Sequence, residues 1–327
     1  MDISVIILTY NEELHIRRCI ENVRDFCADV FIVDSFSIDK TKAIAEELGV
    51  KVVQNQWEGV HARQFNWALT HLPIKTKWVL RLDADEYLTG ELKQEIMLQI
   101  ENLPDDVVGC VFKLRRVFLG RVIRRGMPPV KLLRLFQHKK AICEQRLMDE
   151  HIRLLEGKSV EFEHVFVDEN LNNLSWWSQK HVGYAIREAA DLLNLEYDFL
   201  KESPTHCEQN IQDFTGGMIL GQQAAEKRVK KLKYARLPLF WRAFAYFLYR
   251  YVFKGGCLEG KEGFLWHFLQ GWWYRTLVDA NVLDVKRKAK ALLKCCTERL
   301  SREEINPRKR MSKAIVAVLR DEYGLMI

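Results

Sequence analysis

The chain of 327 residues contains eight cysteines, but it has no Cys-x-x-Cys pair and no spacing typical of zinc ligands. This absence argues against a cysteine-based metal site. Reduced thiols in a cytoplasmic protein are therefore the expectation. A secretory signal peptide is not expected either, because Met1 and Asp2 lead directly into a strand-like apolar run.

Two glycine-rich phosphate-binding motifs are also missing. The first predicted strand is not followed by G-x-G-x-x-G, and G-x-x-x-x-G-K-[ST] occurs nowhere. A dinucleotide-binding fingerprint and a P-loop are therefore not expected, so a bound nucleotide must be held by side chains.

A membrane-spanning run is lacking as well. The most apolar stretch, residues 238–254, is interrupted by Arg242 and Arg250, whereas a span needs roughly 20 apolar residues.

The net charge is a modest +6, and 48% of the residues are hydrophobic, which is enough for a sizeable core. Basic residues gather in segments 227–236, 286–294 and 308–313. Such clusters suit anionic partners, namely phospholipid headgroups, nucleic acid or phosphate-bearing substrates. Solvated helix faces are the alternative explanation.

Apolar runs and helical periodicities alternate along the first third of the chain. Strands are predicted over residues 3–8, 30–34, 51–54 and from Trp78, and helices over residues 14–23, 43–48 and 61–72. This alternation predicts an α/β domain with a parallel sheet and right-handed crossovers. The strand ends then bring Thr9, Asp34, Asp83 and Asp85 to one edge, where ligands of such sheets bind.

Three carboxylates, Asp83, Asp85 and Glu86, follow the last of these strands. Like charges this close repel each other unless a cation neutralises them, and hard divalent cations prefer oxygen ligands. A solvated acidic turn is the alternative. In a nucleotide site, Asp34 could accept a hydrogen bond from the imide of a uracil, Arg63 could neutralise a diphosphate, and Asp83 could accept one from a ribose hydroxyl.

Four motifs in this order carry a resemblance to a known family. They are Ser4-Val5-Ile6-Ile7-Leu8-Thr9-Tyr10-Asn11-Glu12-Glu13, Val33-Asp34-Ser35-x-Ser37-x-Asp39-x-Thr41, Ala62-Arg63-Gln64-Phe65-Asn66-x-Ala68-Leu69 and Asp83-Ala84-Asp85-Glu86. Together they resemble family 2 glycosyltransferases, and within them the bacterial lipopolysaccharide-core and surface-polysaccharide glucosyltransferases. The resemblance implies a Rossmann-like GT-A fold with a mostly parallel sheet flanked by helices, and an inverting transfer from a nucleotide-diphospho-sugar.

The resemblance also implies roles for individual residues. Its nucleoside pocket corresponds to Thr9, Tyr10 or Asn11, Glu12 and Asp34, with Arg63 near it or near the diphosphate. Asp85, assisted by Asp83, would hold Mg²⁺ or Mn²⁺ between the two phosphates. For Asn11 and Glu12 helix capping is the alternative role, and for Arg63 it is a surface ion pair.

An inverting transfer needs a base that deprotonates the acceptor hydroxyl. In family 2 this base is an acidic residue beyond the Asp-x-Asp segment, and Glu150 is the first candidate here, with Asp149 second. Pairing with Arg146 or His151 is the alternative role for this acidic pair. Other candidates for the base are Glu144, Glu161 and Glu163. The arginine-rich strands predicted over residues 107–119 and 130–136 resemble an acceptor-facing surface.

The last third of the chain is rich in aromatic residues. On a helical wheel of residues 238–254, the aromatic side chains share one face, and Arg242, Arg250 and Lys254 share the other. With residues 264–274 this segment predicts interfacial helices on a membrane surface, contacting it over residues 238–274. Two core helices of a C-terminal bundle are the alternative.

These observations predict a GT-A domain over residues 1–200 and a helical, membrane-associating extension over residues 201–327. The expected reaction moves a hexose from a UDP-sugar to a hydroxyl of a lipid-linked saccharide, which could belong to lipopolysaccharide core, O-antigen, capsule or another glycan. The expected location is cytoplasmic, on the inner face of the bacterial plasma membrane, and no nucleic-acid partner is expected. A nucleotide-sugar-forming nucleotidyltransferase and a membrane-bound scaffold with a degenerate GT-A domain are the alternatives.

Overall fold

The computed structural model describes residues 1–144, 150–199, 233–295 and 306–325. These residues fall into two compact units. One comprises Met1–Asn172, and the other comprises the described residues from Asn173 onward. The division predicted from the sequence, residues 1–200 and 201–327, stays a prediction.

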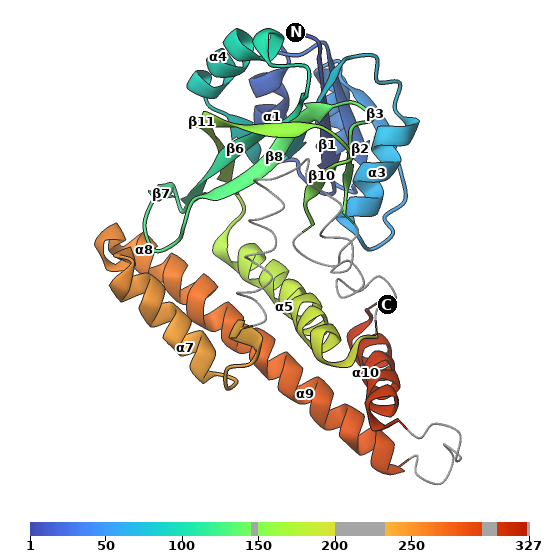
Figure 1. Cartoon of the computed structure of the whole chain (residues 1–327), viewed down its shortest axis with the longest axis vertical. Helices are drawn as coiled ribbons and strands as arrows, with labels where there is room; N and C mark the ends of the chain where they lie inside the picture. The colour runs from blue at the N-terminus through green and yellow to red at the C-terminus, as the bar shows by residue number, and fades with distance from the viewer. Residues whose placement is uncertain (145–149, 200–232, 296–305, 326–327) are drawn as a thin grey trace. The chain divides into compact units, whose positions relative to one another are not determined.

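The first half of the N-terminal unit alternates strands and helices as predicted (Figure 1). The elements are β1 (Ile3–Thr9), α1 (Ile16–Val23), β2 (Asp29–Asp34), α2 (Thr41–Glu47), β3 (Lys51–Gln54), α3 (His61–His71) and β4 (Trp78–Asp83). The four strands are parallel and lie in the order β3-β2-β1-β4. Gly49 ends α2 with a φ of +74°, a conformation that glycine adopts without strain.

The second half of this unit is antiparallel in large part. It comprises β5 (Glu86–Leu88), α4 (Gly90–Gln99), a 3₁₀ turn η1 (Ile100–Asn102), β6 (Val107–Phe118), β7 (Arg121–Ile123), β8 (Val130–Gln137), β9 (Ala141–Cys143), β10 (Ile152–Leu154) and β11 (Lys158–Glu169). β8 is antiparallel to both β4 and β6, and β11 is parallel to β6. The sheet is therefore mixed, and the prediction of a mostly parallel sheet was wrong, because β6 returns through β7 to β8 without a crossover helix.

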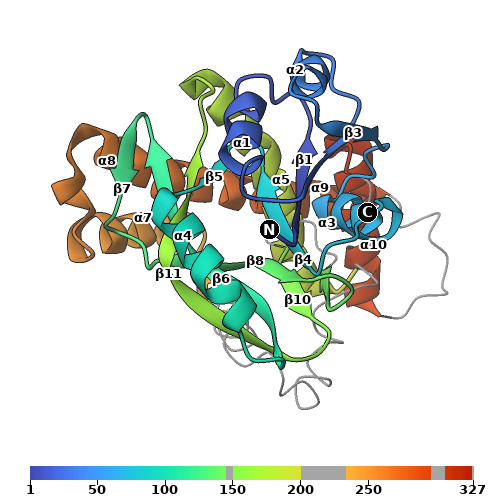
Figure 2. The ribbon, with the colours of Figure 1, turned by 90° about the horizontal axis from the view of Figure 1, so that it is seen from above.

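The sheet is buried on both faces, because successive residues of a strand point to opposite sides. Ile7 and Leu80 pack on one face against α1 and α4. Ile6 and Val79 pack on the other face against α3 (Figure 2). This double burial makes the central strands continuous apolar runs.

The second unit is helical. It comprises α5 (Leu174–Tyr197), α7 (Trp241–Leu248), a π-helix η3 (Tyr249–Phe253), a 3₁₀ turn η4 (Gly256–Glu259), α8 (Gly260–His267), a π-helix η5 (Phe268–Trp273), α9 (Tyr274–Cys295) and α10 (Pro307–Tyr323). Within the described ranges, none of these helices has both the length and the apolar character that crossing a bilayer requires.

The helical-wheel expectation for residues 238–254 was wrong about the arginines. Arg242 and Arg250 are each only 3% exposed, so they do not form an outward polar face with Lys254. Arg242 lies inside because its guanidinium forms a buried ion pair with Asp279 of α9. The local pattern could not indicate this partner.

Candidate active site

Polar side chains meet where β1, β2 and β4 end. In the parallel ladders, Thr9 pairs with Asp34 and Leu8 pairs with Asp83. β1 lies between β2 and β4, so the carboxyl ends of three strands lie side by side. The expectation that Thr9, Asp34 and Asp83 share one edge is thus confirmed, and this edge is where ligands of open α/β sheets bind.

Asp34 is fully buried, and its carboxylate is saturated with protein donors. Oδ1 accepts from the Thr9 hydroxyl at 2.9 Å and from the Ser37 hydroxyl at 2.5 Å. Oδ2 accepts from the Ser37 backbone N–H at 2.9 Å and from the Gln54 amide at 3.3 Å. A carboxylate offers about four acceptor positions. A direct bond from Asp34 to a base would therefore replace one of these contacts.

The segment after β1 is fastened to the loop after β2. Asn11 has a φ of +57°, and its backbone N–H donates to Ser37 while its side-chain oxygen accepts from the Ile38 N–H. The Glu12 backbone N–H donates to Thr41. Tyr10, by contrast, is exposed. Of these side chains, Tyr10 is the one most open to a ligand.

Glu12 connects this segment to the loop after β11 through a buried histidine. Its carboxylate lies 2.7 Å from Nδ1 of His15, and Nε2 of His15 accepts from the Leu171 backbone N–H at 2.8 Å. Because Nε2 accepts, Nδ1 is the ring nitrogen that donates to the Glu12 carboxylate. Glu12 therefore holds the loop that carries Asn170.

Two buried arginines compensate the acidic turn after β4. Nη2 of Arg134 lies 3.4 Å from Asp83, and Nη2 of Arg81 lies 3.7 Å from it. Burial opposes ionisation of Asp83, but Arg134 and Arg81 outweigh it and hold its pKa well below the usual range. Glu86 is buried, pairs with Arg134 and accepts from the Asp83 backbone N–H. Burial raises the pKa of Glu86, and Arg134 opposes that rise.

Asp85 is the carboxylate best suited to a metal ion. It is partly exposed, and its Oδ2 accepts from the Asn170 amide at 3.0 Å. Mg²⁺ is commonly held by one or two carboxylates together with substrate phosphates and water. Asp85 fits that pattern. Among the residues described, no three His, Cys, Asp or Glu side chains are grouped so that they could hold a metal ion.

Glu150 lies beside this acidic turn. Its Oε1 is 3.4 Å from Nη2 of Arg81, the guanidinium that also faces Asp83. Arg81 thus connects the candidate base with the predicted donor site. The second candidate, Asp149, lies outside the described residues. Of the other candidates, Glu161 is paired with Lys113 and Lys131.

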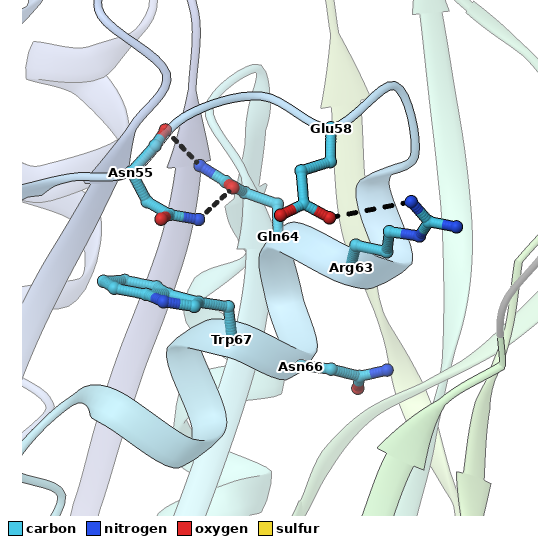
Figure 3. A pocket seen from close by; sticks show the side chains of 6 residues that line it. All are labelled: Asn55, Glu58, Arg63, Gln64, Asn66 and Trp67. Carbon is cyan, nitrogen blue, oxygen red and sulfur yellow. Dashed lines mark hydrogen bonds and ion pairs between the residues drawn. The ribbon is translucent and has the colours of Figure 1, made fainter. Parts of the chain in front are cut away.

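Arg63 lines a pocket of about 420 Å³ between the end of β3 and α3 (Figure 3). It is half-exposed and lies 3.6 Å from Glu58, so it forms the surface ion pair that was the alternative to a ligand contact. Asn55 and Gln64 hydrogen-bond each other on the opposite wall. The lining residues are Asn55, Glu58, Arg63, Gln64, Asn66 and Trp67.

Sequence reasoning missed the residues that support this site. Arg81 carried a signal, because a charged residue within a buried apolar strand is rarely found without a partner. Arg134 was predicted only as one of several acceptor-facing arginines. His15 and Asn170 carried no signal, because their partners are distant in the sequence.

Residues 4–149 match the sequence model of the family described as glycosyl transferase family 2. This part of the chain is therefore similar to the family 2 glycosyltransferases, as the motifs predicted, and its mixed α/β sheet has the Rossmann-like GT-A arrangement.

Named relatives agree with this assignment. An "uncharacterized glycosyltransferase" of Rickettsia bellii is 46% identical over 94 residues, which cover 29% of this chain and 31% of that protein. The lipopolysaccharide core biosynthesis glycosyltransferase LpsC of Rhizobium meliloti is 29% identical over 145 residues, which cover 38% of this chain and 52% of LpsC. The chain thus spans from 31% to 52% of the length of these two relatives.

Among solved structures, S. aureus TarS 1–349 in complex with UDP-GlcNAc is similar over 89% of this chain and 92% of that one. The sequence identity is 15%, and the TM-score is 0.41. Likeness at this level specifies neither a substrate nor a cofactor for this chain.

Proposed function

We propose that this protein is an inverting glycosyltransferase that moves a hexose from a UDP-sugar to a hydroxyl of a lipid-linked saccharide. The observation that carries the proposal is the gathering of Thr9, Asp34 and Asp83 at one sheet edge, within the residues that match the family 2 model. The proposed acceptor belongs to a bacterial surface glycan. This choice is supported by the similarity to LpsC, whose name assigns it to lipopolysaccharide core biosynthesis.

The donor would lie across the ends of β1, β2 and β4. The proposed nucleoside contacts are those of the segment after β1 and of the strand ends, namely Thr9, Tyr10, Asn11, Glu12, Asp34 and Asp83. Arg63 would approach the diphosphate by exchanging its ion pair with Glu58, which costs little because exposed ion pairs contribute only about 0–1 kcal/mol.

Asp85, with Asp83 beside it, would hold a Mg²⁺ or Mn²⁺ ion. Such an ion stabilises the negative charge that develops on a diphosphate leaving group. Of the two carboxylates, Asp85 is the stronger candidate for direct ligation, because Asp83 already faces Arg81 and Arg134. Asn170 donates to Oδ2 of Asp85 and orients the carboxylate.

Glu150 would act as the base, with Asp149 as the second candidate. The acceptor oxygen attacks the anomeric carbon from the face opposite the diphosphate, and the bond from that carbon to the diphosphate oxygen breaks. UDP leaves, and the hydroxyl proton passes to the Glu150 carboxylate. Arg81, 3.4 Å from that carboxylate, fixes its position. The proposed location is the cytoplasm, on the inner face of the plasma membrane, where residues 238–274 would face the lipid that carries the acceptor.

The first test is a thermal-shift panel of UDP, GDP and other nucleotides with and without Mn²⁺. A ligand that binds only the folded state raises stability by RT ln(1 + [L]/Kd), so selectivity is read directly. We expect stabilisation by UDP that requires Mn²⁺ and is lost in Asp85→Ala. Asp25→Ala, which changes an exposed carboxylate after α1, should respond as the wild type does.

Other outcomes separate the alternatives. Stabilisation by GDP would retain the transferase and overturn the UDP assignment, and no response to any nucleotide would favour the scaffold. In a transfer assay, Glu150→Gln should lose roughly 10² to 10⁴ in turnover, the usual contribution of a general base. Near-normal turnover in that variant would remove Glu150 from this role.

A further inference from the structure

Residues 240–273 form a helical hairpin in which two arginines, a glutamate and a histidine are buried. One arm is α7 and η3, and the other is η4, α8 and η5. Arg242 is buried in the first arm, where its Nε lies 2.8 Å from Asp279 of α9. Arg250 is also buried, with its guanidinium 5.3 Å from the ring centre of Tyr246. Glu259 and His267 of the second arm are buried as well.

The outer surface of the same hairpin is apolar. Trp241 is 72% exposed and Phe253 is 79% exposed, with Tyr249 and Val252 between them also exposed. The spacing of 241, 249 and 252 places these residues on one side of the arm. Leu258, at the turn between the arms, is 65% exposed. The inner side of the hairpin is apolar as well, since Phe247, Trp266 and Leu269 are buried. An ordinary surface helix has charged and polar residues on its outer face instead.

Ring contacts join the two arms of the hairpin. Tyr251 of η3 packs on Phe247 of α7 with ring centres 5.3 Å apart, and on Phe264 of α8 at 5.6 Å. Phe264 in turn stacks on Phe268 at 6.1 Å. Phe264 is itself exposed. The apolar surface is therefore continuous from one arm of the hairpin to the other, because the rings of both arms pack against each other.

The exposed charge at the turn is positive. Lys254 and Lys261 are exposed on either side of Leu258, whereas Glu259 is buried and Glu262 is half-buried. Tryptophan, tyrosine and phenylalanine favour the boundary between lipid tails and headgroups, and lysines beside them interact with anionic phosphates. The exposed aromatic residues and the exposed lysines are therefore both suited to the surface of an anionic lipid bilayer.

We infer that this hairpin docks on an anionic phospholipid bilayer. Trp241, Tyr249, Phe253 and Leu258 enter the headgroup boundary, and Lys254 and Lys261 contact lipid phosphates. The burial of the two arginines and the exposure of the aromatic residues are observations that do not depend on the proposed function. The choice of lipid over a protein partner rests on that function, because its acceptor is lipid-linked.

The test is co-sedimentation of the full chain with vesicles of phosphatidylcholine alone and of phosphatidylcholine mixed with phosphatidylglycerol. We expect binding that is stronger to the mixed vesicles and weaker at high salt. The double variant Phe253→Ser/Leu258→Ser should bind at least about tenfold more weakly, since two large apolar side chains no longer enter the lipid. Lys254→Gln/Lys261→Gln should lose the preference for the anionic vesicles.

A matched control is Leu283→Ser, which changes a 50% exposed leucine of α9 outside the hairpin and should bind as the wild type does. Equal binding by Phe253→Ser/Leu258→Ser and the wild type would overturn the inference, as would no binding by the wild type. So would a dimer that the double variant abolishes in the absence of vesicles, which would make a second copy the partner. UDP-dependent stabilisation is measured in parallel. Its absence together with intact vesicle binding would refute the proposed function alone.

Discussion

The buried ion pair between Arg242 and Asp279 provides the sharpest test of whether the hairpin of residues 240–273 buries its charges. Asp279 is 1% exposed, and its carboxylate accepts from Nε of Arg242 at 2.8 Å and from the Phe240 backbone N–H at 2.7 Å. In Asp279→Ala, the Arg242 guanidinium would remain buried without its counter-charge. Removing one partner of a buried pair costs about 3–5 kcal/mol. The expected loss is therefore about 3–5 kcal/mol in the free energy of unfolding of the helical unit.

Urea unfolding followed by tryptophan fluorescence measures this loss, because most tryptophans lie in the helical unit. They are Trp176, Trp177, Trp241, Trp266, Trp272 and Trp273. Asp284→Ala is the control on the same helix. Its carboxylate is partly exposed, pairs with Lys288 and accepts from the Tyr323 hydroxyl, so its removal should cost less than removal of the buried Asp279.

A double variant separates the ion pair from simple loss of packing. Arg242→Met/Asp279→Leu removes both charges and should recover much of the stability lost in Asp279→Ala, because apolar replacements of a buried pair are often neutral or stabilising. A loss in Asp279→Ala no larger than in Asp284→Ala would refute the reasoning. It would mean that Arg242 reaches water and is not a buried charge of the hairpin.

Three further predictions concern other parts of the molecule. Arg81→Met should lower kcat by about tenfold or more, because Arg81 positions the proposed base, and should also weaken UDP-dependent stabilisation, because Arg81 faces Asp83; unchanged kcat would exclude the positioning role. Gly256→Ala should destabilise the protein by about 1–3 kcal/mol, since a Cβ there would lie 2.5 Å from the His267 ring. Gly183→Ala, with open space around it, should be neutral or stabilising in the same unfolding assay. Burial, aided by Arg250, lowers the pKa of His267 from 6.5 to about 4. The unfolded chain therefore binds this proton first, so stability should fall by up to roughly 3 kcal/mol as pH drops from about 6.5 to 4, and His267→Phe should show a smaller fall in urea titrations over that range.

Local patterns in the sequence determined the first half of the N-terminal unit. The apolar runs that became β1, β2, β3 and β4 are short and separated by helical periodicities, and such alternation has one common solution. Parallel strands place their carboxyl ends together, so Thr9, Asp34 and Asp83 could be assigned to one edge before any coordinates. The order of four motifs was enough to indicate the family, because each motif ends a strand or begins a helix near the carboxyl edge of the parallel strands.

Contacts between distant residues were decided by the tertiary structure alone. The chain's return from β6 to β8 made the sheet mixed. The sequence could not predict this, because the periodicity of a strand is the same in parallel and antiparallel pairs. Asn170 meets Asp85 across 85 positions and Arg81 meets Glu150 across 69. Arg242 pairs with Asp279 at a separation of 37 residues. This pairing buries an arginine that the helical wheel had assigned to an outward polar face. A helical wheel shows which residues share a face, but the partner that buries a charge is set only when the helices pack.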